Sequence, residues 1–362
     1  MLQALAAGIA TTRENQRRDR QGGGSSIVRS ALLDLPDVMF YRIYSEIPQL
    51  VAPHTAVCKQ FRDQLIKAAH AHLVVRSCPT LRKQVTSMRR FRGRITVSLH
   101  DPDSKSKLAF PFVDVMCGGT LAEVGNALPI GWKNLTALNF SATRLPHECL
   151  ERLGNALQAC NAIQQLDFTG NQIGPSGVRS LLPALLHLPQ LRRLDLGGND
   201  LKMPGLAALS EQMQPTRLAS LEYLDLSDNK LGSQGVRQLG AAYTRAAVHP
   251  ILLKHLDLSK NGIDGAAVEQ LAAGLELCTS LTSLDLSVNK EFGAPGVRHL
   301  APILKNNTLI TCINLNQAGL YPEGLAALSG TLDSCLHLKE MKLYDNNMGD
   351  KGAAHLTSIF ER

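Results

Sequence analysis

Apolar residues recur along residues 135–362 in one pattern that the chain repeats eight times. In the clearest copy, Ile163, Leu166 and Phe168 precede Leu181 and Leu185, which lie at helical spacing. The copies begin 28 to 32 residues apart, and self-similarity at such a period predicts a solenoid of stacked units. The copies begin at Leu135, Ile163, Leu191, Leu221, Leu253, Leu281, Ile310 and Leu338.

Each copy changes its hydrophobic period halfway along. The first half alternates apolar and polar residues, as in Leu224-Asp225-Leu226, and predicts a short strand, whereas the second half predicts a helix. Parallel strands need such a long crossover between neighbours. Because helices are wider than strands, the stack should curve into an α/β horseshoe with the parallel sheet inside and the helices outside.

An asparagine follows the strand in six of the eight copies. Its side-chain amide can donate to carbonyls of the turn and accept from an N–H of the adjacent copy, so a ladder of such residues is expected. Thr143 and Ala318 replace it in the first and seventh copies, where looser turns are expected. The ladder residues are Asn171, Asn199, Asn229, Asn261, Asn289 and Asn346.

This pattern, LxxLxLxxNxL with a helical repeat of about 28 residues, resembles the leucine-rich repeat family in its ribonuclease-inhibitor-like class. The resemblance covers residues 135–362, about two thirds of the chain. It implies a horseshoe that binds a protein client on its concave face, and it implies no particular partner.

Residues between the strand leucines should face the hollow, because side chains alternate along a strand. Five of them are aspartates in one column, at positions 167, 195, 225, 257 and 285. A cationic partner would relieve their mutual repulsion, although Leu-Asp-Leu is also the commonest strand sequence in such repeats. Exposed aromatic residues are better candidates for interface anchors. The candidate partner-binding residues are Arg193, Asp195, Tyr223, Asp225, His255, Asp257, Asp285, Lys342 and Tyr344.

Residues 31–75 have a different pattern. A Leu-Pro pair opens an apolar helix, two prolines interrupt it, and a second apolar helix follows. This segment resembles an F-box, which implies docking on a Skp-type adaptor of a cullin ubiquitin ligase. The alternative is a small all-α cap that only covers the first strand of the solenoid. The candidate adaptor-binding residues are Leu35, Pro36, Ile43, Ile47, Val57 and Phe61.

The positive charge of the chain is concentrated near its N-terminus. The net charge is +7 overall, and the first 94 residues hold 16 of the 38 Lys and Arg residues but 6 of the 31 acidic ones. Residues 1–30 are expected to be a flexible basic tail, and residues 76–134 a basic linker and a degenerate first repeat. The basic part, residues 76–94, can contact RNA or another polyanion, or be a solvated face. The candidate polyanion-binding residues are Arg82, Lys83, Arg89, Arg90, Arg92 and Arg94.

The chain carries no motif for nucleotide, metal or nucleophilic chemistry, so no enzyme activity and no cofactor are expected. No apolar run is long enough to span a membrane. Cys160, Cys278 and Cys335 share one repeat position that also accepts leucine, which predicts buried, reduced thiols. We therefore expect an intracellular protein in the cytoplasm, with a mitochondrial or other organellar location open because of the basic N-terminus.

Two functions follow from these patterns. The first is a substrate receptor in which residues 31–75 hold the adaptor and the concave face holds the client. The second is an architectural subunit of a large intracellular or organellar assembly, such as a ribonucleoprotein, ciliary or respiratory complex, in which residues 76–94 contact RNA or neighbouring proteins.

Overall fold

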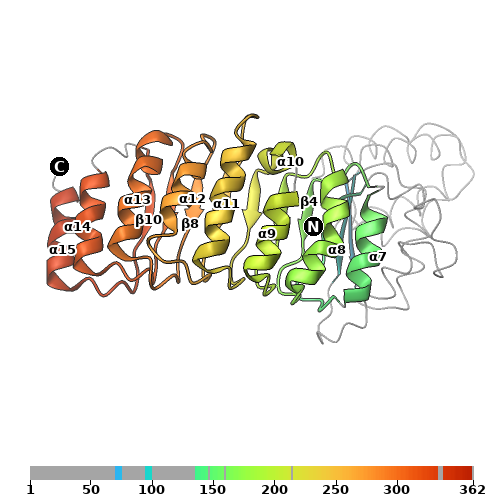
Figure 1. The fold of residues 1–362 in the computed structure, drawn as a ribbon, viewed down its shortest axis with the longest axis horizontal. Helices are drawn as coiled ribbons and strands as arrows, with labels where there is room; N and C mark the ends of the chain where they lie inside the picture. Colours follow the sequence, from blue (N-terminus) through green and yellow to red (C-terminus); the bar gives the residue numbers. More distant parts are fainter. Residues whose placement is uncertain are drawn as a thin grey trace, which may run out of the picture. The chain divides into compact units, whose positions relative to one another are not determined.

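The computed structural model of the chain describes residues 70–75, 94–99, 135–145, 147–158, 160–212, 215–332 and 337–360. All of them belong to one compact unit, Asp63–Arg362 (Figure 1). Within the described ranges, every helix is too short or too polar to cross a bilayer.

Within the described residues, ten parallel strands form one sheet in which chain order is also spatial order. The eight predicted strands from β3 onward are confirmed, and each pairs with the strands of the neighbouring repeats. The strands are β1 (His70–Val75), β2 (Arg94–Leu99), β3 (Leu135–Asn139), β4 (Gln165–Asp167), β5 (Arg193–Asp195), β6 (Tyr223–Asp225), β7 (His255–Asp257), β8 (Ser283–Asp285), β9 (Cys312–Asn314) and β10 (Glu340–Lys342).

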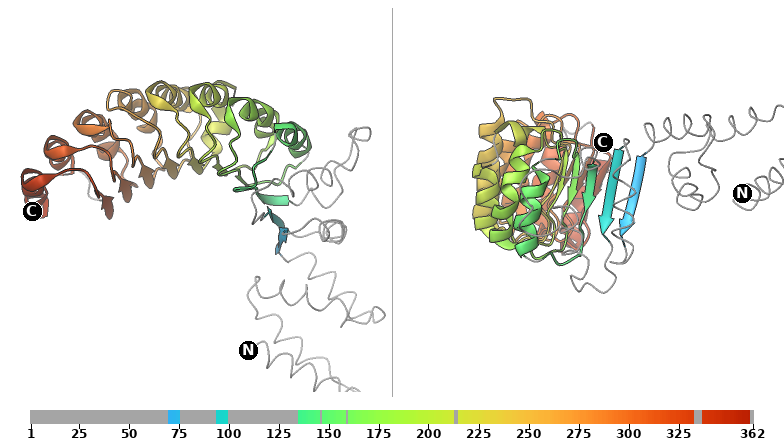
Figure 2. Two further views of the ribbon diagram at one scale, coloured as in Figure 1. Left: turned by 90° about the horizontal axis from the view of Figure 1, so that it is seen from below. Right: turned by 90° about the vertical axis from the view of Figure 1, so that its right-hand side faces the viewer.

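Helices lie between consecutive strands from β3 onward and form a second layer. Along these repeats the strands line the inner side of a curve and the helices its outer side (Figure 2). The helices are α7 (His147–Leu157), α8 (Gly174–His187), α9 (Lys202–Gln212), α10 (Pro215–Ser220), α11 (Gly232–Ala246), α12 (Val268–Leu275), α13 (Gly293–Asn306), α14 (Tyr321–Leu332) and α15 (Gly349–Phe360).

The hydrophobic core lies between the two layers. From β3 to β9 the central leucine or isoleucine of each strand is buried there, as Leu166, Leu194 and Leu224 are, whereas Met341 at the centre of β10 is half-buried. Phe140 and Phe168 stack with ring centroids 5.7 Å apart where the first two repeats meet. The alternation seen in the sequence thus sends one side of every strand into the core and leaves the other on the concave face.

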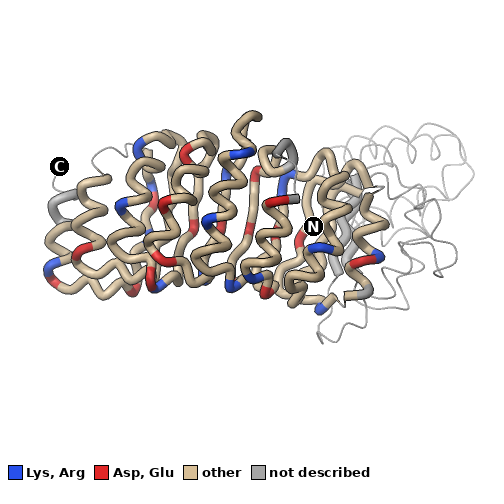
Figure 3. The backbone as a smooth tube through the Cα atoms, viewed as in Figure 1, with Lys and Arg blue, Asp and Glu red and all other residues tan. Residues whose placement is uncertain are grey.

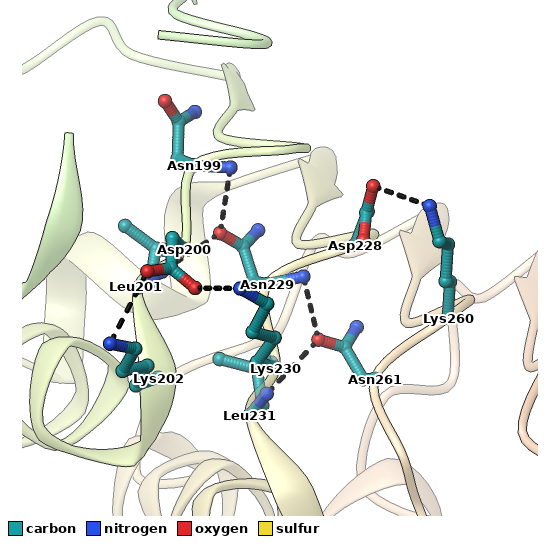
Figure 4. Close-up of polar contacts among 10 residues, drawn as sticks. All are labelled: Asn199, Asp200, Leu201, Lys202, Asp228, Asn229, Lys230, Leu231, Lys260 and Asn261. Carbon is teal, nitrogen blue, oxygen red and sulfur yellow. Dashed lines mark hydrogen bonds and ion pairs between the residues drawn. The ribbon is translucent and has the colours of Figure 1, made fainter. Parts of the chain in front are cut away.

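The predicted asparagine ladder is present and buried (Figure 4). Asn229 donates from Nδ2 to the carbonyls of Leu196, 2.8 Å away, and Ser227, 2.9 Å away. Its Oδ1 accepts from the backbone N–H groups of Asn199 and Leu201, at 3.1 and 3.2 Å. One side chain therefore supplies hydrogen bonds to two turns that leave the sheet.

The helices start without capping side chains of their own, as α8 and α11 show. Instead, a backbone N–H at the start of the helix donates to the carbonyl of the next ladder residue. Gly174 reaches Asn199 and Gly232 reaches Asn261, both at 2.9 Å. Each repeat thus relies on its successor for an acceptor that satisfies one of the N–H donors left free at a helix N-terminus.

The two positions without asparagine differ. Thr143 takes over part of the amide's role, since its hydroxyl donates to the carbonyl of Phe140 at 2.7 Å and lies 3.1 Å from Oδ1 of Asn171. Ala318 has only backbone groups to offer: its N–H donates to Oδ1 of Asn346 at 2.9 Å, and its carbonyl accepts from the N–H of Gly293 at 3.0 Å. The ladder is therefore continuous at its start and interrupted between Asn289 and Asn346.

The buried-thiol prediction is confirmed for two of its three residues. Cys160 and Cys278 are buried free thiols, and burial raises the pKa of each to about 12. Cys335 lies outside the described residues.

One prediction at the N-terminal side is wrong. We expected helix through residue 75, but His70–Val75 is strand β1, which pairs in register with β2. The residues Leu73, Val74 and Val75 suit a strand, and the partner strand supplies the hydrogen bonds. The degenerate first repeat expected within residues 76–134 contains strand β2. Residues 1–30 and the rest of the segment 31–75 lie outside the described ranges.

Candidate functional site

The five aspartates of the predicted column lie on the concave side of the sheet. Strand pairing places each directly beside the next, from β4 to β8. Their neighbours along each strand are the buried core leucines, so the register assigned from sequence is confirmed. Whether this face binds a partner is a separate question.

Most of these carboxylates have a local structural role. Each accepts, at Oδ1, a hydrogen bond from the backbone N–H two residues further on. The pairs are Asp167 with Thr169, Asp225 with Ser227, Asp257 with Ser259, and Asp285 with Ser287, at 2.8 to 2.9 Å. This arrangement stabilises the turn after the strand and accounts for the repeated aspartate without any ligand.

Amide side chains meet both ends of the column. Asn139 donates from Nδ2 to Oδ2 of Asp167 at 2.9 Å, and Asn314 donates to Oδ2 of Asp285 at 2.7 Å. The repulsion at the ends is thereby reduced within the chain itself, and the middle of the column is where the charge is least compensated by amides.

The third repeat departs from the pattern. Asp195 accepts two hydrogen bonds from Arg193, from Nε at 2.7 Å and from the terminal nitrogen Nη2 at 3.0 Å. The side chain of Asp195 is 6% exposed and that of Arg193 is 42% exposed. Residue 197, which is serine or threonine in most other copies, is glycine here. A bidentate ion pair therefore replaces the turn-stabilising contact.

The Arg193 guanidinium lies over the ring of Tyr223 on the next strand, 3.6 Å from its centroid. The ring of Tyr223 in turn lies 5.7 Å from that of His255, tilted by 40°. Strand pairing places Arg193, Tyr223 and His255 side by side across β5, β6 and β7. We call these three residues the Arg-Tyr-His row.

Burial and neighbouring charges shift the proton affinities in this area. Burial raises the pKa of Asp195 to about 6, although the hydrogen bonds from Arg193 oppose the shift. Burial also raises the pKa of Asp257, against the hydrogen bond from Ser259, and raises the pKa of Tyr223. The pKa of His255 is lowered by burial and by the positive charges of Arg193 and Lys254.

The structure thus brings most of the predicted concave residues together. Asp195, Asp225 and Asp257 lie in the column beside the Arg-Tyr-His row, and Asp285 is next in that column. Lys342 lies on the last strand, 3.5 Å from Glu340, and Tyr344 just beyond it is 75% exposed. These last two residues belong to a different part of the face.

The remaining sequence candidates are not placed. The six adaptor candidates of residues 31–75 and the basic residues from Arg82 to Arg92 lie outside the described ranges. Arg94 is described as the first residue of β2.

Sequence reasoning missed the ion pair and the role of Gly197. A Cβ at Gly197 would lie 2.7 Å from Oγ of Ser227 and 3.0 Å from a carboxylate oxygen of Asp225. The sequence did mark this position, because Gly197 replaces the serine or threonine that most copies have there. The ion pair between Arg193 and Asp195 could not be predicted, because it depends on the side-chain rotamers.

Basic and acidic residues also alternate along the edge formed by the turns after the strands (Figure 3). There, Asp200 pairs with Lys230 at 2.8 Å and Asp228 pairs with Lys260 at 2.8 Å. These lysines are well exposed, so such pairs contribute little to stability. Among the described residues, no three His, Cys, Asp or Glu side chains gather closely enough to hold a metal ion.

Comparison with known proteins agrees with this geometry. A family model described as Leucine Rich repeat matches residues 159–182, 187–210, 217–240, 249–272, 277–301 and 334–356. The ribonuclease inhibitor of Sus scrofa is 30% identical over 214 residues, which cover 59% of this chain and 46% of that protein. The NACHT, LRR and PYD domains-containing protein 3 of Homo sapiens is 32% identical over 206 residues, 55% of this chain and 19% of that protein.

The chain therefore spans less than half the length of either relative. Among solved structures, the complex of Rad7 and Elc1 in yeast aligns with a TM-score of 0.44 at 14% identity, covering 96% of this chain and 94% of that one. A TM-score and a sequence identity this low support no inference about function. The family match, the similarity to ribonuclease inhibitor and the strand-and-helix repeats agree: the described repeats form a leucine-rich repeat solenoid that is similar to the ribonuclease-inhibitor-like class.

Proposed function

We propose that this protein is a non-catalytic interaction module that binds a protein client on its concave face. The observation that carries the proposal is the Arg-Tyr-His row, which lies beside the aspartate column where the Arg193–Asp195 ion pair replaces the regular turn contact. Tyrosine and arginine are the residue types that anchor protein interfaces. One relative is named as an inhibitor of ribonuclease, which is itself a protein.

The client-binding region is centred on β5, β6 and β7. Tyr223 offers a half-buried ring and His255 an exposed one, and Asp225 and Asp257 place carboxylates next to them. A protein surface with apolar and hydrogen-bonding groups fits this combination better than a small molecule, because a sheet face offers a broad contact area.

We further propose that the client is presented to a ubiquitin ligase. In this proposal, residues 31–75 hold a Skp-type adaptor and its cullin while the repeats hold the substrate. The support is the F-box resemblance of Leu35, Pro36 and the residues around Val57.

Affinity purification of the full chain, with identification of the retained proteins, tests both the client-binding and the adaptor-binding proposals. Tyr223→Ala should lose the client and keep the adaptor, whereas Ile43→Asp should lose the adaptor and keep the client. Recovery of ribosomal, ciliary or respiratory-complex subunits, with no adaptor or cullin, would replace the receptor by the architectural function. If no retained chain depends on Tyr223, the concave-face proposal itself fails.

A further inference from the structure

The Arg193–Asp195 ion pair is not needed to close its turn. In four neighbouring repeats, the aspartate at the same position accepts a backbone N–H instead. The third repeat is therefore an exception to a solution that the chain uses on both sides of it, at Asp167 and at Asp225.

The Arg193–Asp195 ion pair requires the desolvation of a carboxylate, and closing the turn does not require this pair. Asp195 has the least exposed carboxylate of the five, and it lies between Asp167 and Asp225 in the column. Taking an ion pair out of water often cancels its own attraction. Only the carboxylate of this pair is buried, and a simpler turn contact works in the neighbouring repeats, so the pair is best explained by the position that it gives to Arg193.

The pair fixes that position on two sides. Two of the guanidinium's nitrogens are held by Asp195, and its plane lies over Tyr223. A free arginine loses side-chain entropy when it binds, and an arginine that is already ordered loses less. The guanidinium carries five N–H donors, and the two bonds to Asp195 leave others for a partner.

The negative charge around the remaining N–H donors of Arg193 restricts which acceptors they can bind. Asp195 balances the charge of Arg193, Asp167 and Asp225 flank Asp195 on the adjacent strands, and Asp257 follows Asp225 in the column. A carboxylate or phosphate would be repelled by these neighbours. An uncharged acceptor, such as a main-chain carbonyl, can accept from the guanidinium without that repulsion.

Resting on the proposed function, we propose that Asp195 is a positioning residue, which locks Arg193 over Tyr223 so that the guanidinium donates to a main-chain carbonyl of the bound protein. Gly197 belongs to this device, since a side chain there would press against Ser227 and Asp225.

The lock is tested first without a partner. In the full chain, the Nε–H signal of Arg193 in NMR spectra should exchange slowly with solvent. Asp195→Asn should make that exchange fast, while Asp167→Asn, which removes the same charge one repeat away, should leave it slow. An Arg193 signal that exchanges equally fast in the wild-type chain and in Asp195→Asn would overturn the lock.

The second test measures affinity for the protein that wild type retains and Tyr223→Ala loses. Asp195→Asn and Arg193→Lys should each weaken its binding about tenfold or more, since both destroy the bidentate geometry. Asp167→Asn should weaken it by less, and Glu269→Gln on the outer face of α12 should leave it unchanged. Thermal melts of each variant establish that it is folded.

The outcomes separate the two proposals. If Tyr223→Ala abolishes binding while Asp195→Asn retains wild-type affinity, the client-binding function stands and the positioning role is wrong. A loss with Asp167→Asn as large as with Asp195→Asn would show that charge alone matters, and would also overturn the positioning role. If no retained protein depends on Tyr223, the proposed function is wrong whatever the NMR result.

Discussion

Asn229 and Asn261 lie in adjacent repeats, and the side-chain oxygen of Asn261 accepts a hydrogen bond from the backbone N–H of Asn229 at 3.0 Å. The same relationship links Asn199 to Asn229 and Asn171 to Asn199, at 3.1 and 2.9 Å. A single buried side chain therefore connects the turns of neighbouring repeats, and the consequences can be measured one residue at a time.

Asn229→Ala should lower the free energy of unfolding by about 1–3 kcal/mol, because buried turn groups lose their partners. Urea denaturation at one pH measures the change. Asn306→Ala, on the exposed face of α13, is the matched control and should stay close to wild type. Equal stability of Asn229→Ala and wild type would contradict the structural role of the ladder.

Val288→Asn should stabilise the protein by about 1 kcal/mol, because Val288 has a positive φ of 58° that a β-branched residue adopts at a cost. Lys260 occupies the same position in the previous repeat with a φ of 55°. Lys260→Asn should give a smaller gain, since lysine is not β-branched. A lower melting temperature for Val288→Asn would show that the valine makes contacts that outweigh its backbone cost.

Tyr243→Phe should also stabilise the protein, by about 1 kcal/mol. Tyr243 is fully buried on α11, and its hydroxyl finds no hydrogen-bond partner among the described residues. Removing the oxygen therefore removes an uncompensated desolvation cost. Tyr321→Phe at an exposed site should change nothing, and a destabilised Tyr243→Phe would point to an internal water that satisfies the hydroxyl.

The stability difference between wild type and Asp195→Asn should depend on pH. Burial, opposed by Arg193, places the native pKa of Asp195 at about 6, above the unfolded value of about 3.9. Between these values the native state binds more protons, so wild type loses stability as pH rises through about 6. Asparagine does not titrate, so Asp195→Asn should gain relative to wild type between about pH 5 and pH 7.5. A difference that stays constant over this range would place the native pKa elsewhere.

The repeats could be predicted from sequence because one pattern constrains many residues at once. A shift of one residue would have turned Asp195 into the core and Leu194 onto the surface, so the register was strongly determined. Strand β1 was missed because its pairing with β2 is a long-range contact. The short segment His70–Val75 has no repeat signature of its own.

The candidate site was predictable in position and not in geometry. Alternation alone places Arg193, Tyr223 and His255 on one face. The sequence contains no information that Asp195 turns toward Arg193 while Asp225 turns toward the Ser227 N–H. That choice depends on local space, which the absence of a side chain at Gly197 provides.

We expect Ala318 to weaken the seam between the sixth and seventh repeats. Every ladder asparagine fastens the turn of the preceding repeat, whereas here alanine leaves backbone contacts, the packing of α13 on α14, and the hydrogen bonds from Asn314 to Asp285 and from the Thr311 hydroxyl to the Thr282 carbonyl. In a one-dimensional array, each interface contributes separately to how far unfolding spreads. Opening of the last two repeats should therefore stop at this seam, and amide hydrogens on its two sides should exchange with different free energies of opening. The same seam is where we expect the horseshoe to bend most easily.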